Sequence, residues 1–349
     1  QAEDGIRDSV ASRGLGDVYK RQVPLENIKD RILTKKMRAM QLVEYEKPLT
    51  LRKIEIPEPG STQLLLKIHA VGMNFGDTLL IKGTYQEKPK LPFTIGMEIC
   101  GTIEKLGVNV KGFTVGQRVA IYSGFGGLAE YGCFDANQCV LVPDAMPSED
   151  AAAFLVAYGT SHVALERRAK LKQDEKLLVL GAAGGVGLTA VELGKLMGAE
   201  VMACARGANK LNICQKMGAD HLIDSETDNI REVVKSLGGA DVVYDPIGGE
   251  QFTAALRSCN PEARILPLGF ASGTIPQIPA NIILVKNIEI IGYYWGGYAK
   301  FNPEVLLDSF NKLFSWYEEG KLSPHISCLL YTSDAADEGL GVDLGGRRI

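Results

Sequence analysis

The sequence predicts an α/β protein in which a doubly wound sheet of six parallel strands follows a smaller, mostly β domain. Three observations lead to this prediction. Apolar segments of strand and helix length alternate after residue 151, an apolar run at 176–180 ends in a glycine-rich turn, and short β-like runs fill the part before residue 150. Because parallel strands need crossover helices, the alternation indicates a parallel sheet covered by helices on both faces.

Both ends of the chain are set aside before the elements are assigned. Residues 1–22 and 328–349 resemble translated sequencing-adapter read-through almost letter for letter, and residues 23–36 resemble translated upstream sequence. We therefore expect non-native tails at 1–36 and 328–349, with Met37 as the natural start and the natural C-terminus missing. A pair of natural polar tails is the alternative, and composition alone does not separate the two.

Composition excludes several kinds of partner. Hydrophobic residues make up 46% of the 349 residues, and the formal net charge of −4 comes without any block of Lys and Arg. These values fit a globular core and argue against nucleic acid as a partner. No apolar run reaches membrane-spanning length and no signal peptide is visible, so no membrane partner is expected. The seven cysteines form no Cys-x-x-Cys pair, which predicts free thiols in a reducing cytoplasm.

The two parts of the chain have different periodicities. The first part carries β-like runs at 63–70, 98–106, 118–123 and 139–142, separated by Gly and Pro turns, which predicts a compact antiparallel domain. In the second part, strands are predicted at 176–180, 200–205, 221–224, 241–245, 264–269 and 288–293. The clearest helices are predicted at 151–169, 228–237 and 302–321. The last of these should return to pack on the first domain.

The turn Ala182-Ala-Gly-Gly-Val-Gly187 is the most informative functional feature. Backbone N–H groups at a helix N-terminus bind the pyrophosphate of a dinucleotide, and the helix dipole favours the anion. Gly184 and Gly185 would allow the tight turn and the close approach, and Gly187 would let the helix pack on the strand. An ordinary strand-to-helix turn is the alternative.

The end of the second predicted strand indicates which dinucleotide binds. NAD enzymes usually place Asp or Glu there to bind the ribose 2′-OH, but no acid lies between Val201 and Lys210. Arg206 and Lys210 could instead pair with a 2′-phosphate. The sequence therefore predicts NADPH rather than NADH, with two solvated cations at a helix start as the alternative.

Several motifs together resemble one protein family. They are Asn74-Phe-Gly-Asp77, Lys82-Gly-Thr-Tyr85, Leu91-Pro-Phe-Thr-Ile-Gly-Met-Glu98, Gly116-Gln-Arg-Val119, the glycine turn and Lys321-Leu-Ser-Pro-His-Ile-Ser327. Over 37–327 the chain resembles the medium-chain dehydrogenase/reductase superfamily, in its zinc-free quinone oxidoreductase (zeta-crystallin-like) branch. The resemblance implies a GroES-like substrate domain at 37–157, completed by 294–327, and a Rossmann NADPH-binding domain at 158–293. The family has Gln where this chain has Glu192, and we expect Glu192 to be tolerated on the helix surface.

A zinc site is argued against by the residues themselves. Zinc-dependent members of the superfamily use a Cys and a Gly-His-Glu segment, and the corresponding places here are Asn74 and Gly96-Met97-Glu98. Asn and Met are poor ligands for Zn²⁺. The histidines show no ligand spacing and are expected to be structural or exposed: His69, His162, His221 and His325. We expect no metal.

The resemblance implies hydride donation from NADPH to a quinone or to an α,β-unsaturated carbonyl. Such a site must stabilise negative charge on the acceptor oxygen and supply a proton. Tyr85 is the candidate proton donor or relay, with a packing tyrosine as the alternative. Asn74 is expected to orient the nicotinamide amide or the acceptor carbonyl, and Asp77 is equally a candidate turn or cap residue.

The resemblance implies that Thr160 lies close to the cofactor. Ala183 and Val186 belong to the glycine turn, and Gly269 and Phe270 follow the fifth predicted strand, where the carboxyl edge of the sheet meets the nicotinamide. A core position is the alternative for Phe270. Tyr293, Tyr294 and Trp295 are expected to form an interdomain wall or to line the substrate pocket, with an oligomer contact or core patch as the alternative. Three functions stay open. An NADPH-dependent quinone or enone reductase is favoured over an enoyl thioester reductase acting on CoA or carrier-bound chains, and over a non-catalytic NADPH-binding protein. A small-molecule substrate and a homodimer are expected.

Overall fold

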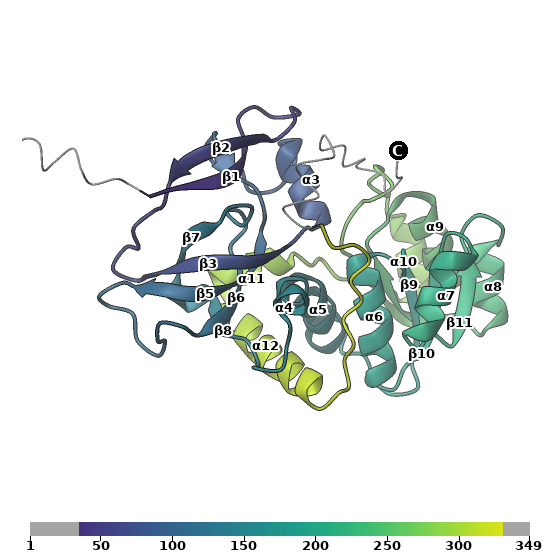
Figure 1. Ribbon diagram of the computed structural model, residues 1–349. Helices are drawn as coiled ribbons and strands as arrows, with labels where there is room; N and C mark the ends of the chain where they lie inside the picture. Colours follow the sequence, from purple (N-terminus) through teal and green to yellow (C-terminus); the bar gives the residue numbers. More distant parts are fainter. Residues whose placement is uncertain (1–34, 331–349) are drawn as a thin grey trace, which may run out of the picture.

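The computed structural model describes residues 35–330, which form three sheets (Figure 1). Two antiparallel sheets make up the part of the chain before residue 142, and a six-stranded parallel sheet lies at the other end of the molecule. Helices near the middle of the chain lie between these two parts (Figure 1). The α/β architecture with a separate β domain is therefore confirmed, and the exact domain boundaries stay predictions.

The β part contains a small sheet and a larger one. The small sheet has the order β2-β1-β4, from β1 (Lys36–Leu42), β2 (Thr50–Glu55) and β4 (Phe93–Thr94). The larger has the order β7-β3-β5-β6-β8, from β3 (Gln63–Gly72), β5 (Glu98–Leu106), β6 (Arg118–Tyr122), β7 (Tyr131–Asp135) and β8 (Cys139–Leu141). Strand β1 begins inside the expected tail, since Lys36 pairs with Glu55. Residues 1–34 and 331–349 of the expected tails lie outside the described residues.

The six-stranded sheet has the order β11-β10-β9-β12-β13-β14, and every neighbouring pair is parallel. Its strands are β9 (Lys176–Leu180), β10 (Glu200–Ala205), β11 (His221–Asp224), β12 (Ala240–Asp245), β13 (Cys259–Pro267) and β14 (Glu289–Ile290). The order reverses at β9 and β12, the topological switch point where ligands bind in doubly wound folds. The last predicted strand, 288–293, is shortened because the chain leaves the sheet after Ile290.

Helices cover both faces of this sheet because its strands are apolar on both sides. Leu177 and Val179 of β9 pack in the core shared with α5 (Leu155–His162) and α6 (Gly185–Leu196). The alternate residues Leu178 and Leu180 pack in the core of the opposite face. Helices α8 (Ile230–Ser236) and α9 (Gly249–Ser258) bury their apolar sides there. The remaining helices are α3 (Phe75–Ile81), α7 (Ala208–Lys216), α10 (Ala280–Lys286) and α11 (Tyr298–Phe301).

The predicted helix at 151–169 is wrong as a single element. It is divided into α4 (Ser148–Ala152), α5 and a π-helical segment (Val163–Arg168). The break between α4 and α5 leaves the backbone N–H of Val156 free to donate to the buried carboxylate of Glu98 at 3.0 Å. Satisfying a buried carboxylate outweighs the helical bonds lost at the break.

Helix α12 (Pro303–Glu318) packs on the connecting helices instead of on a sheet of the β part. The ring of Phe314 stacks on Phe154 with centroids 5.4 Å apart, and Ser309 Oγ lies 2.8 Å from Nδ1 of His162. Within residues 35–330 no helix is long and apolar enough to cross a membrane. The cysteines, all of them among these residues, are unpaired.

Candidate cofactor and substrate site

The glycine turn joins β9 to α6 at the carboxyl edge of the parallel sheet. A side chain at Gly187 would place its Cβ 2.3 Å from the carbonyl oxygen of Gly181, so only glycine lets the helix approach the strand this closely. Gly184 and Gly185 are exposed, and a Cβ at Gly185 would meet nothing within 4 Å. The first N–H groups of α6 have no partner within the helix. The turn therefore offers an open anion-binding surface beside Ala183 and Val186.

The end of β10 carries exposed cations, together with an acid from the next strand. Arg206 Nε lies 3.5 Å from Oε1 of Glu226, and both side chains are exposed. Gly207 donates its N–H to Asp224 Oδ1 at 3.1 Å, which fixes the turn before α7. Lys210 is exposed on the first turn of α7. The sequence analysis found no acid between Val201 and Lys210 but missed Glu226, because the residues after β11 reach this position only in the folded sheet.

Helix α5 connects the turn to the β part. Ser161 Oγ donates to the carbonyl of Val186 at 2.8 Å and also contacts Thr189 Oγ1 and the Tyr244 hydroxyl, both at 2.8 Å. The neighbouring Thr160 is half-buried, and its carbonyl accepts the hydroxyl of Tyr293 at 2.9 Å. This buried hydroxyl network positions α5 against the start of α6.

Gly269 and Phe270 follow β13 at the same carboxyl edge. A Cβ at Gly269 would lie 3.3 Å from the carbonyl oxygen of Pro246, and the backbone N–H of Ala271 donates to that oxygen at 3.1 Å. Phe270 is 41% exposed and lies beside Gly248. An exposed aromatic ring here is not a core residue, which leaves it free to contact a ligand.

In the β part, Asn74 is held by two buried carboxylates. Its Nδ2 donates to Glu98 Oε2 at 3.0 Å and to the Gly72 carbonyl at 3.3 Å. Its backbone N–H donates to Asp77 Oδ2 at 2.9 Å, and Asp77 Oδ1 accepts the N–H of Gly96 at 3.2 Å. Asp77 is therefore a cap residue of α3. The sequence analysis left open whether it is a turn residue or a cap residue. The Glu98 carboxylate is the residue that the sequence analysis did not single out.

Burial changes the protonation of both carboxyl groups. Desolvation raises the pKa of Glu98 to about 7. The hydrogen bonds from Asn74 and from the N–H groups of Val156 and Leu155 lower this pKa, but by less than desolvation raises it. Desolvation likewise raises the pKa of Asp77 to about 6, against three backbone N–H donors. Two carboxyl groups that titrate near neutrality thus lie beside Asn74.

Tyr85 lies in a loop after α3 and is half-buried. Its ring packs beside the cluster of Leu42, Leu80, Phe93, Ile95 and Met97. Desolvation is the main cause that raises the pKa of its hydroxyl well above the usual value, and Tyr122 and Tyr294 interact with this hydroxyl. The phenol of Tyr85 therefore stays protonated at neutral pH, while its ring packs at the edge of this cluster.

The aromatic run after β14 divides between the two parts of the molecule. Tyr293 bonds to α5 through Thr160. Trp295 is buried against Tyr122 of β6, with ring centroids 4.8 Å apart, and it also contacts Gly159 of α5. Tyr294 is 40% exposed. These contacts join the β part to α5, as an interdomain wall does.

Residues 35–330 contain no group of three or more His, Cys, Asp or Glu side chains placed to hold a metal ion. Met97 is buried in the core, and its Sδ would lie 3.2 Å from a Cβ at Gly76. Among the histidines, His162 is buried between Ser309 and Glu166, and burial lowers its pKa to about 4. It is a structural, neutral histidine.

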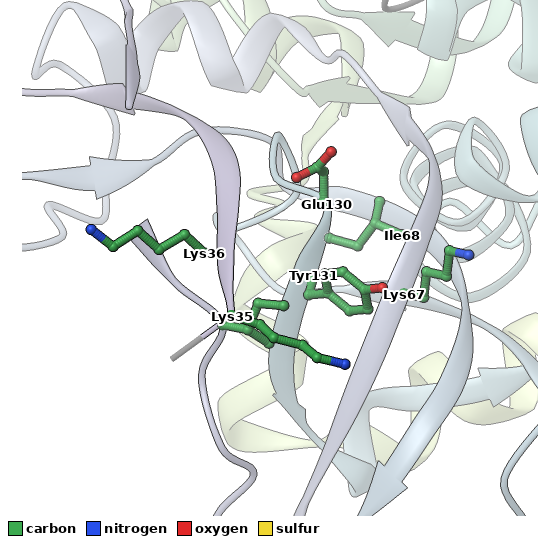
Figure 2. Close-up of a pocket in the computed structure, with 7 residues that line it drawn as sticks. Lys35, Lys36, Lys67, Ile68, Glu130 and Tyr131 are labelled. Carbon is green, nitrogen blue, oxygen red and sulfur yellow. The ribbon is translucent and has the colours of Figure 1, made fainter. Parts of the chain in front are cut away.

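An open groove of about 640 Å³ lies away from these residues, between the two sheets of the β part (Figure 2). It is lined by Lys35, Lys36, Ile56, Lys67, Ile68, Glu130 and Tyr131. The ammonium groups of Lys36 and Lys67 point away from each other in Figure 2, and Arg38 Nε already donates to the Glu130 carboxylate at 3.0 Å. The groove therefore has no converging charge, and no residue predicted for the site lines it.

Glu192 was expected on the surface of α6, and this is wrong. Its Oε2 accepts the Tyr158 hydroxyl at 2.5 Å and its Oε1 accepts the N–H of Ser323 at 2.8 Å. Burial raises the pKa of Glu192. The residue is half-buried because residues near 323 return across α6, which a helical period alone does not indicate.

Comparisons with known proteins agree with this architecture. A family model described as the alcohol dehydrogenase GroES-like domain matches residues 60–144, and one described as zinc-binding dehydrogenase matches residues 185–311. A quinone oxidoreductase-like protein 2 homolog of Nematostella vectensis is 39% identical over 306 residues, covering 84% of this chain and 82% of the relative.

Two further similar proteins are described as quinone oxidoreductases. Human quinone oxidoreductase is 32% identical over 265 residues, covering 74% of this chain and 80% of the relative. The structure of Escherichia coli quinone oxidoreductase complexed with NADPH matches with a TM-score of 0.76 and 26% identity, over 83% of this chain and 90% of that one. The family resemblance noted in the sequence is thereby confirmed.

Proposed function

Because this chain belongs to the medium-chain dehydrogenase/reductase superfamily, among the quinone oxidoreductase-like proteins, we propose that it is an NADPH-dependent reductase of quinones or α,β-unsaturated carbonyls. One observation carries the proposal: helix α5 joins the open glycine turn to the residues of the β part that would face the substrate. Its Ser161 bonds to Val186 of the turn, and its Val156 bonds to Glu98, the carboxylate that orients Asn74.

The residues around the turn fit a dinucleotide phosphate. The pyrophosphate would be held by the backbone of Ala183, Gly184, Gly185, Val186 and Gly187, with Gly185 leaving open the space that a side chain would fill. A 2′-phosphate would be held by Arg206 and Lys210, both exposed at the end of β10. Thr160, Gly269 and Phe270 would lie along the nicotinamide half. Bound NADPH would supply the hydride.

Side chains of the protein would then stabilise the negative charge on the acceptor and supply the proton. A hydride added to an enone leaves negative charge on the acceptor, which must be stabilised and protonated. Tyr85 would donate that proton, since its phenol is neutral at working pH. Asn74 would orient the nicotinamide amide or the acceptor carbonyl, with its own side chain held in one rotamer by Glu98.

A single screen tests this function. NADPH and NADH are compared at 340 nm against quinones, enones and enoyl thioesters, with the parent chain and Tyr85→Phe. We expect NADPH-dependent reduction of quinones or enones, with enone turnover reduced about 100-fold in the variant. Tyr131→Phe, in the groove of Figure 2, is the matched control and keeps parental turnover. Preference for enoyl thioesters would indicate a thioester reductase, and cofactor binding without turnover would indicate a non-catalytic protein.

The proposal extends to assembly and compartment. A second copy of the chain would cover the exposed apolar side chains near α10, Ile275, Ile278, Leu284 and Val285, and pair with the edge strand β14, giving a homodimer. Sedimentation at several concentrations tests this. The unpaired cysteines fit a reducing compartment such as the cytoplasm.

A further inference from the structure

Three phenols meet where the β part contacts the segment that follows β14. Tyr85 comes from the loop after α3, Tyr122 ends β6, and Tyr294 precedes Trp295. We propose that these three hydroxyls form one hydrogen-bonded proton relay, with Tyr294 as the end that takes protons from solvent and Tyr85 as the end that delivers them. The inference rests on the proposed function for the substrate that accepts the proton, and on the contacts of the three tyrosines for the relay.

Two of the three hydroxyls, those of Tyr122 and Tyr294, lie beside Gly296. A Cβ at this buried glycine would lie 2.8 Å from the Tyr122 hydroxyl oxygen and 3.1 Å from the Tyr294 hydroxyl oxygen. The Tyr85 hydroxyl interacts with the hydroxyls of both Tyr122 and Tyr294. The ring of Trp295 lies edge-on to Tyr122, at 4.8 Å and 65°, and so fixes that ring. Tyr122 and Tyr294 therefore share a space that only glycine leaves open, and Tyr85 interacts with both.

Exposure gives the relay a direction. Tyr294 is 40% exposed, whereas Tyr85 and Tyr122 are half-buried. The carboxylate of Glu87 raises the pKa of all three phenols, although desolvation is the larger cause in each. Lys300 Nζ binds Glu87 Oε1 at 2.6 Å, which holds the loop of Tyr85 near the segment of Tyr294. The phenols therefore stay protonated, and water reaches the cluster at Tyr294.

The proton balance is simple. A hydride from the reduced nicotinamide forms a C–H bond at the β-carbon of an enone, and the C=C electron pair becomes an enolate. The enolate takes the proton of Tyr85 as the phenol O–H bond breaks. The Tyr85 phenolate takes the proton of Tyr294, and Tyr294 recovers one from water, so each turnover consumes one solvent proton. Tyr122 donates a hydrogen bond to the Tyr85 phenolate and stabilises it, and Tyr122 keeps its own proton.

The first test removes one hydroxyl and keeps the ring. Tyr294→Phe is expected to lower kcat for an enone about tenfold, to leave KM for NADPH unchanged, and to raise the solvent deuterium isotope effect on kcat, because proton resupply becomes limiting. Tyr298→Phe, whose ring contacts Phe301 and Tyr293, is the matched control and keeps parental kcat. A merely structural role of Tyr294 would change stability and leave the isotope effect unaltered.

The second test fills the shared space. Gly296→Ala puts a methyl group against both hydroxyls, so it is expected to lower kcat as Tyr294→Phe does, and the double variant is expected to be no worse than either single one. Gly292→Ala is the control, because nothing lies within 4 Å of its Cβ. Additive losses in the double variant would show that the two sites act separately and would overturn the relay.

A third measurement needs no cofactor. In a double-mutant cycle of Tyr85→Phe and Tyr294→Phe, the two unfolding constants of the cofactor-free protein are expected to couple about fivefold. Coupling near onefold would overturn the relay whatever the activity. If the parent reduces no quinone, enone or thioester, the proposed function fails, and this cycle still decides whether the phenols form one unit.

Discussion

Glu98 fixes the side chain of Asn74: its Oε2 accepts Nδ2–H of Asn74 at 3.0 Å while its Oε1 accepts the N–H of Val156, also at 3.0 Å. One buried carboxylate therefore joins the residue before α3 to the start of α5. By the resemblance, zinc-dependent members of the family have a metal ligand in the place of Asn74, so hydrogen bonds here orient a residue that a metal would otherwise organise.

Stability should fall as the pH rises through the pKa of Glu98. Burial raises this pKa from 4.5 to about 7, so the stabilising protonated form is fully present below pH 4.5 and is lost as the pH approaches and passes 7. The loss is on the order of 3 kcal/mol at most. Urea unfolding from pH 5 to 8 should show a flatter profile for Glu98→Gln than for the parent. Glu104→Gln, an exposed residue on the same strand, should keep the parental slope; an unchanged slope in Glu98→Gln would contradict the assignment.

Alanine substitutions at two glycines of the turn should have different effects, one on stability and the other on cofactor binding. At Gly187 the added Cβ would lie 2.3 Å from the Gly181 carbonyl, so Gly187→Ala should cost about 1–3 kcal/mol of unfolding free energy. At Gly185 the space is open, so Gly185→Ala should keep the fold and weaken NADPH binding by about tenfold, because the methyl group obstructs the phosphate. Thermal melting and fluorescence titration measure the two effects. A stable Gly187→Ala protein, or unaltered NADPH affinity in Gly185→Ala, would be the opposite result.

Cofactor preference should depend on Arg206. Removing its guanidinium in Arg206→Ala should lower kcat/KM for NADPH by about 10-fold to 100-fold and leave NADH nearly unaffected, because only NADPH carries the 2′-phosphate. Glu226→Gln removes the carboxylate 3.5 Å from Arg206 Nε and should strengthen NADPH use slightly. Equal loss for both cofactors in Arg206→Ala would show that the residue does not bind the phosphate.

The protein should keep its stability when Glu192 is replaced by glutamine and lose stability when it is replaced by alanine. In Glu192→Ala the Tyr158 hydroxyl and the Ser323 N–H both lose their acceptor, which should cost about 1–3 kcal/mol. Glu192→Gln can still accept from Ser323 and can donate to the Tyr158 oxygen. Its stability at pH 8 should equal or exceed that of the parent, because burial disfavours the charged form of Glu192 and raises its pKa. Chemical denaturation of the two variants distinguishes these cases, and equal losses would contradict the hydrogen-bond argument.

Much of the fold could be predicted from local patterns. Strands β5, β9, β10 and β11 have the predicted bounds, because each is a short apolar run between turn residues. Strands β1, β2, β4 and β7 were not predicted. Strand β4 has two residues only, the others carry polar residues on the exposed face, and the first residue of β1 lies in the expected tail. The helix at 151–169 was wrong because the need of Glu98 for donors breaks it, and that need belongs to a strand far away in sequence.

The sequence by itself determined the parallel sheet, the glycine turn, the exposed cations at the end of β10 and the family, because these depend on periodicity, on steric limits of single residues and on short motifs. The tertiary structure alone decided which groups share protons. Asn74 meets Glu98, Tyr294 meets Tyr85, and Ser323 meets Glu192 only when distant segments pack together. Hydrogen bonds and desolvation act over a few ångströms, and those distances are set by topology instead of by spacing along the chain.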